Sequence, residues 1–130
     1  MTALDPSPVL SSRRIALDQL DDLREQVARF LDRPSAEGLR SLTNRAKQFL
    51  RFEADEIVPE VASSGLPEDR ALAVLDGHAA LAARLNRLSW VVPGSAEVQT
   101  EVLQLRHDLL AQIDTYNDLK LPRGALISGT

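Results

Sequence analysis

Four polar side chains of this sequence fall on helical stripes that are otherwise apolar: Glu53, His78, Gln112 and Tyr116. Glu53 falls on a stripe that repeats every three or four residues and is otherwise apolar: Leu39, Leu42, Ala46, Phe49 and Ile57. A carboxylate among such neighbours is costly to bury unless it is paired. A carboxylate and an imidazole that face each other between helices are also groups that bind metals. We expect Glu53 to pair with Tyr116, with His78, or with both.

Two helices are predicted in the first half of the chain. Ser11 or Ser12 can cap the first, which ends before Pro34. Its core stripe is Ala16, Leu20, Leu23, Val27 and Phe30. Ser35 can cap the second, which runs to Pro59 and is either stopped or kinked there. The second helix therefore carries Glu53 close to its end.

Two further helices are predicted in the second half. Pro67 suits the first turn of the third helix, Ser95 can cap the fourth, and Pro122 closes it. The third stripe is Ala71, Val74, His78, Leu81, Leu85 and Leu88. The fourth stripe is Val98, Val102, Leu105, Leu109, Gln112, Tyr116 and Leu119. His78, Gln112 and Tyr116 thus belong to stripes that must face a core.

Four amphipathic helices joined by short turns predict an all-α, antiparallel up-down-up-down four-helix bundle. We expect a single domain over residues 1–130, with loosely ordered tails at 1–10 and 123–130. If the second helix is kinked at Pro59 and continues towards Ser63, Glu53 lies about nine residues before its end. His78 lies about eleven residues after the start of the next helix, so at about 1.5 Å per residue their heights differ by only a few ångströms. Gln112 falls at a comparable height, with Tyr116 one turn nearer the end. The four polar side chains are therefore expected to meet inside the bundle.

At this interior level the chain resembles the hemerythrin-like, or HHE cation-binding, family. The resemblance is carried by Phe49 to Pro59, by Asp76 to Leu81, and by Gln112 to Pro122. It implies a hemerythrin-like bundle with a non-haem di-iron centre, used in oxygen carriage, in sensing oxygen or nitric oxide, or in iron handling. Glu53 and His78 match ligands of that centre.

Most other ligand positions implied by the resemblance hold residues of the wrong type: Phe49, the possible partners of His78 at Val74 and Ala82, Gln112, and either Tyr116 or Asn117. Stable transition-metal binding usually takes at least about three suitable protein ligands. We therefore expect a degenerate metal centre with no cofactor. The alternative left open is non-haem iron or another divalent cation held by Glu53 and His78 with help from water or a partner chain.

The expected function is that of a non-enzymatic interaction or ligand-sensing module. The alternative is a metal-binding protein that senses oxygen or nitric oxide or handles iron. No Ser-His-Asp arrangement, glycine-rich phosphate loop or zinc-ligand spacing occurs in the sequence. The other histidine, His107, is flanked by Arg106 and Asp108 and is expected to face solvent.

Composition narrows the choice of partners. The formal net charge is −4 and the arginines are scattered among acidic residues, so no basic face is expected to bind nucleic acid. No apolar run approaches the roughly 20 residues that cross a bilayer. The chain has no cysteine. We expect a cytoplasmic protein that binds neither nucleic acid nor membrane.

One short apolar run, Trp90-Val91-Val92, lies outside the periodic helices. Two interpretations stay open: the run plugs the end of the bundle, or it forms part of an interface with a partner protein or with a second copy in a homodimer.

Overall fold

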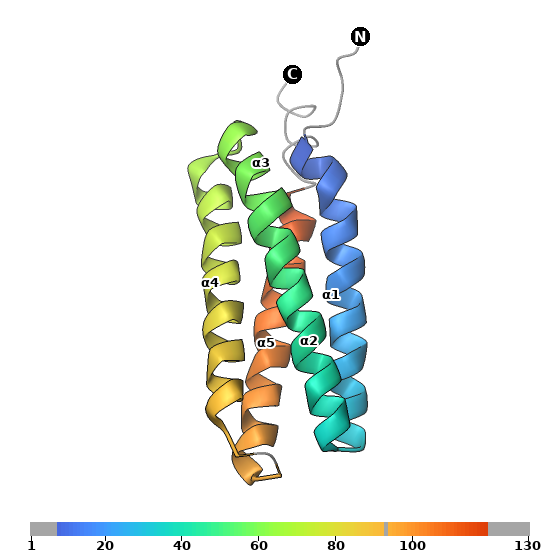
Figure 1. The fold of residues 1–130 in the computed structure, drawn as a ribbon. Helices are drawn as coiled ribbons and strands as arrows, with labels where there is room; N and C mark the ends of the chain where they lie inside the picture. The colour runs from blue at the N-terminus through green and yellow to red at the C-terminus, as the bar shows by residue number, and fades with distance from the viewer. Residues whose placement is uncertain (1–7, 93, 120–130) are drawn as a thin grey trace.

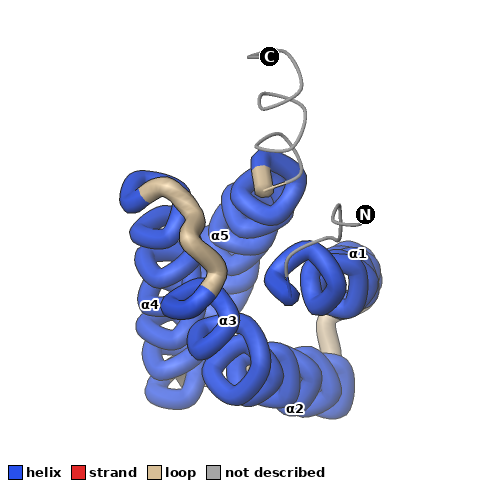
Figure 2. The backbone as a smooth tube through the Cα atoms, turned by 90° about the horizontal axis from the view of Figure 1, so that it is seen from above, coloured by secondary structure: helices blue, strands red, loops and turns tan. Residues whose placement is uncertain are grey.

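The computed structural model describes residues 8–92 and 94–119, which form an all-α bundle of four rods (Figure 1). The helices are α1 (Pro8–Asp32), α2 (Ala36–Phe52), the π-helical turn η2 (Glu53–Ile57), α3 (Val58–Ser63), α4 (Glu68–Trp90) and α5 (Ala96–Asp118). The segments α2, η2 and α3 follow one another without a break and make the second rod. Seen from above, α1 lies between α2 and α5, and α4 closes the ring on the other side (Figure 2). The predicted all-α four-helix bundle is confirmed.

The first helix includes residues that were expected to lie outside it. α1 already contains Pro8 to Leu10, so the prediction of a loose lead-in is wrong for these residues. Proline is favoured in the first turn of a helix because its fixed φ is helical and its missing N–H has no helical acceptor there. Neither Ser11 nor Ser12 is therefore a cap, and the Ser12 hydroxyl donates to the Glu60 carboxylate instead. Residues 1–7 lie outside the described part of the chain.

The other predicted boundaries hold with smaller changes. The N–H of Gly38 donates to Ser35 Oγ over 2.9 Å, so Ser35 caps α2 as predicted. Ser95 stands at the cap position of α5, but its side chain makes no capping hydrogen bond. α5 ends at Asp118. The predicted closing residue Pro122 and the tail 123–130 lie outside the described residues.

Pro59 does not end the second rod, which passes through η2 and continues to Ser63. In this turn the N–H of Val58 donates to the carbonyl of Glu53, five residues back. Val61 lies nineteen positions after Leu42, whereas five α-helical turns take about eighteen residues. The π turn absorbs the extra residue, so both side chains face the core.

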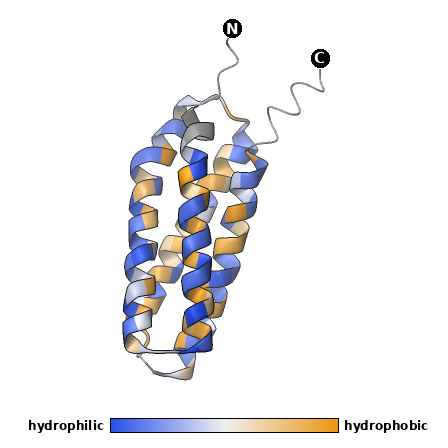
Figure 3. Cartoon of the chain, turned by 90° about the vertical axis from the view of Figure 1, so that its right-hand side faces the viewer, coloured by the Kyte–Doolittle hydropathy of each residue, from blue (hydrophilic) through white to orange (hydrophobic). Residues whose placement is uncertain are grey.

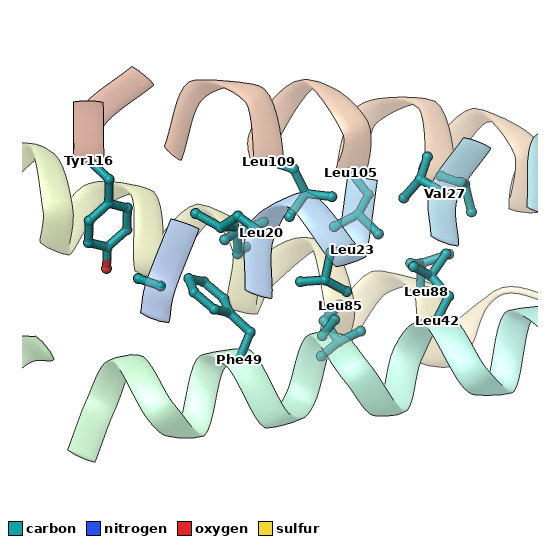
Figure 4. Packing of buried hydrophobic residues seen from close by; sticks show 14 of the residues in the cluster. Leu20, Leu23, Val27, Leu42, Phe49, Leu85, Leu88, Leu105, Leu109 and Tyr116 are labelled. Carbon is teal, nitrogen blue, oxygen red and sulfur yellow. The ribbon is translucent and has the colours of Figure 1, made fainter. Parts of the chain in front are cut away.

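The residues of the predicted stripes form the core. Hydrophobic residues accordingly lie mostly on one side of each helix and hydrophilic residues mostly on the other (Figure 3). Leucines of α1, α2, α4 and α5 interdigitate along the axis of the bundle (Figure 4). Leu39, Ala71 and His78 sit at the edge of this core and are half-buried. The remaining stripe residues are buried, which leaves Glu53 and Gln112 as the buried polar residues of the described chain.

Candidate functional site

The centre of the candidate site is the Glu53 carboxylate, whose residue has no exposed surface. Its Oε1 lies 2.8 Å from His78 Nδ1. Its Oε2 accepts hydrogen bonds from Gln112 Nε2 and from the Tyr116 hydroxyl, each over 2.6 Å. The structure thus brings together the four side chains singled out in the sequence, and we call them the Glu53 cluster.

The elements that carry the cluster explain how a carboxylate reaches this position. Glu53 is the first residue of η2, and a π turn inside an α-helix is a feature often found at functional sites. His78 comes from α4, while Gln112 and Tyr116 come from successive turns of α5. Because short, charge-assisted hydrogen bonds are stronger than neutral ones, this buried carboxylate is stabilised by its surroundings.

Gln112 is held in one orientation. Its Nε2 donates to Glu53 and also lies 3.3 Å from the carbonyl of Val74, so the amide hydrogens are used. Its Oε1 is buried and has no partner among the described residues. A β carbon on Gly77 would stand 1.7 Å from this oxygen, so the glycine makes room for the amide. Gly77 was not predicted as a site residue, although a glycine in mid-helix costs about 1 kcal/mol relative to alanine and was the signal available.

Tyr116 is a neutral hydrogen-bond donor. Burial raises the pKa of its hydroxyl well above the ordinary value, and the negative charge of Glu53 and the hydrogen bond between them act in the same direction. Its backbone carbonyl accepts a hydrogen bond from Arg13 Nε over 2.7 Å. Arg13 therefore links α1 to the last turn of α5 at the residue that carries the Tyr116 hydroxyl, a contact that the helical stripes did not predict.

The donor set does not fit a metal centre. Both oxygens of Glu53 already accept hydrogen bonds, Gln112 presents its NH₂ group to the cluster, and Tyr116 is protonated. Phe49, at a position where the family resemblance implies a ligand, projects into the core as apolar bulk (Figure 4). No group of three or more His, Cys, Asp or Glu side chains able to hold a metal ion occurs within residues 8–92 and 94–119. The residues present therefore do not match a di-iron centre.

A second polar cluster links α4 to α5. Arg84 donates to Glu101 over 2.8 Å and to Asp108 over 3.1 Å, with all three side chains about one-fifth exposed. The hydrogen bond to Glu101 contributes most to a raised pKa of the Arg84 guanidinium, which partial burial opposes. This cluster was not predicted, because Arg84 lies beside the core stripe and not on it.

Two of the three residues of the apolar run at the α4–α5 turn do not plug the end of the bundle, while Val91 packs against the core. Trp90 is 81% exposed and Val92 68% exposed, while Val91 is half-buried. The plug interpretation is therefore wrong for Trp90 and Val92. His107 is exposed, as expected.

Comparison of the chain with family models, with curated proteins and with solved structures gives no match. The fold and the geometry of the Glu53 cluster are therefore the basis for any assignment of function. Of the helices in the described residues, none combines the length and apolar character required to cross a membrane.

Proposed function

We propose that this protein is a hemerythrin-like bundle with a degenerate metal centre that acts as a non-enzymatic interaction or ligand-sensing module. In this proposal the Glu53 cluster stands where the family resemblance implies a metal centre. Its hydrogen bonds hold α4 and α5 against the second rod. Its task is to keep one arrangement of the helices, so that the outer surface of the bundle is presented rigidly to a partner.

The observation that carries the proposal is the complete burial of Glu53 beneath three donors. Breaking a buried, paired charge typically costs about 3–5 kcal/mol, because the charge left behind is uncompensated. Such an arrangement selects one packing of the helices over others. It leaves the carboxylate no free oxygen that faces an open coordination position.

Binding through the surface is supported by the distribution of apolar side chains. Trp90 and Val92 are mostly exposed, and several leucines of α4 and α5 are more than one-third exposed. Clusters of exposed apolar residues on a folded protein tend to mark interfaces. The fully paired Glu53 carboxylate in the core and the exposed apolar residues on the surface together favour an interaction module over an enzyme.

Metal content separates the proposal from the metal-binding alternative. The protein is purified from iron-supplemented cells, and iron, manganese and zinc per chain are measured by elemental analysis. The expected result is a small metal content that is the same in the wild type, Glu53→Ala and His78→Ala. The matched control is His107→Ala, which removes the exposed histidine.

Stoichiometric metal in the wild type that is lost in Glu53→Ala and His78→Ala but kept in His107→Ala would contradict the proposal. It would favour the iron-handling or gas-sensing alternative.

A further inference from the structure

Helix α4 carries an apolar stripe on its outer side as well as on its inner side. Leu72 and Trp90 each lie nine residues from the buried Leu81, and nine residues are two and a half helical turns. Both side chains therefore point directly away from the core. Their exposed fractions are 48% for Leu72 and 81% for Trp90.

The exposed residues that continue this line repeat at intervals of three and four. We call them the outer stripe of α4: Leu72, Leu75, Ala79, Ala82, Asn86 and Trp90. Such spacing is typical of a seam between two packed helices, and a single polar residue such as Asn86 often sets the register of the seam. Within the bundle, α4 contacts α2, α3 and α5 on its inner side, and no described segment covers the outer stripe (Figure 2).

The two ends of the outer stripe, Leu72 and Trp90, are equally far from the level of Leu81. Two exposed alanines flank the middle, Ala79 of the outer stripe and Ala83 directly beside it, and small side chains let two helices approach closely. A second α4 laid antiparallel on the first would place Leu72 of each copy against Trp90 of the other.

Two oppositely charged residues beside the stripe lie at nearly equal distances from the level of Leu81. Asp76 and Arg87 are eleven residues apart, close to three turns, so they lie on the same side of α4. Asp76 stands five residues before Leu81 and Arg87 six after it, so in an antiparallel pair their levels differ by about 1.5 Å. Both are exposed, and neither takes part in an ion pair among the described residues. A parallel two-fold pair would instead place each charge at the height of its like and on the opposite flank, so Asp76 and Arg87 would form no pair.

We propose that a second copy of this chain docks on the outer stripe of α4, antiparallel and related by a two-fold axis at the level of Leu81. Trp90 packs on Leu72 of the partner copy, and Asp76 pairs with Arg87 of the partner copy at two equivalent places. The inference rests on the proposed role as an interaction module and names the partner. It extends the interface expected at Trp90 along the whole of α4.

The test follows self-association by sedimentation velocity over about a hundredfold range of concentration, reaching the high micromolar range expected for a small interface. The fluorescence of Trp90, the one tryptophan in the sequence, is recorded on the same samples. A blue shift is expected as the dimer forms, because the indole leaves water. Asp76→Arg and Arg87→Asp are each expected to weaken dimerisation at least about tenfold, the equivalent of about 1.4 kcal/mol. The double variant is expected to restore dimerisation, since the pair is re-formed with its signs exchanged.

A matched pair of leucines controls for the general effect of surface substitution. Leu75→Arg is expected to abolish the dimer, whereas Leu110→Arg is not. The two side chains have similar exposed fractions, 37% and 39%. Leu110 and Asp108 lie on opposite sides of Leu109, and Asp108 faces α4 through Arg84, so Leu110 points away from α4. Helical circular dichroism and urea unfolding verify that each variant is folded.

Three results would overturn the inference: a wild type that stays monomeric over the whole range, a dimer insensitive to the charge reversals, or a double variant that is not restored. If a different protein occupies the outer stripe, the purified wild type would stay monomeric, which is the first of these results. None of the three bears on metal content, so a failure of this inference is distinguishable from a failure of the proposed function.

Discussion

The side-chain carbonyl oxygen of Gln112 lies 1.7 Å from the position that a β carbon on Gly77 would occupy. The amide cannot turn away without breaking its hydrogen bond to Glu53. A glycine on α4 is thus required by a side chain of α5, which is in turn required by a carboxylate of η2.

Gly77→Ala is therefore expected to destabilise the protein by about 2 kcal/mol, although alanine is the better helix former. The free energy of unfolding in urea measures the effect. In a Gln112→Ala background the same substitution is expected to be neutral or stabilising, because the clash is gone. An equal cost of Gly77→Ala in both backgrounds would show that the amide is not what the glycine accommodates.

Tyr116 gives a pH dependence of known sign. Its pKa is raised in the folded protein, so its contribution to stability is complete below the unfolded pKa near 10.0 and is lost as the pH rises further. The free energy of unfolding is expected to fall above that pH by up to about 1.4 kcal/mol per unit. Tyr116→Phe removes this part of the dependence and costs about 2 kcal/mol at neutral pH.

Phenolate absorbance checks the same point directly, because Tyr116 is the one tyrosine in the sequence. In the urea-unfolded chain it is expected to titrate near pH 10, and in the native protein only at higher pH or on unfolding. A native titration at the ordinary pKa would mean that the hydroxyl is not buried against Glu53.

The carboxyl end of α5 is held by two arginines from other helices. Arg13 Nε donates to the Tyr116 carbonyl over 2.7 Å, and Arg70 donates to the Asp118 carbonyl over 3.0 Å in a more exposed contact. Arg13→Ala is expected to cost about 1.5 kcal/mol and Arg70→Ala less than about 1 kcal/mol. Hydrogen exchange should accelerate in the last turn of α5 in Arg13→Ala. Equal, small effects of the two variants would rule out a special role for Arg13.

Arg84 is expected to contribute to stability mainly by pairing with the two carboxylates that it contacts. Arg84→Leu leaves the carboxylates of Glu101 and Asp108 partly buried without a cationic partner, which we expect to cost about 1–3 kcal/mol. The triple variant Arg84→Leu, Glu101→Gln, Asp108→Asn is expected to recover most of this loss, because no unpaired charge remains. The free energies of unfolding of the two variants are compared in urea at the same ionic strength. A triple variant as unstable as the single one would contradict the explanation.

Helical periodicity was sufficient to predict which residues face the core and that Glu53, His78, Gln112 and Tyr116 meet there. It did not predict η2, although the run Phe49, Glu53, Ile57 and Val61 repeats every four residues for three intervals, which a straight α-helix cannot keep on one face.

The remaining contacts depend on side chains that reach across from neighbouring helices. Arg13 and Arg84 lie beside their core stripes and bring long side chains back to partners on α5. The need for Gly77 arises only once the amide of Gln112 is in place. Such relationships are set by three-dimensional packing and leave little trace in the spacing of residues along one helix.

The hydroxyl proton of Tyr116 offers the most direct test that Glu53 is locked by protein donors and does not serve as a metal ligand. In an O–H···O bond of 2.6 Å within the core, this proton should give a slowly exchanging, strongly downfield NMR resonance that vanishes in Glu53→Ala. We predict that the resonance is present and unchanged when ferrous iron is added without oxygen. A resonance that is lost on addition of stoichiometric iron, while His107→Ala still responds in the same way, would show that Glu53 exchanges its hydrogen bonds for a metal.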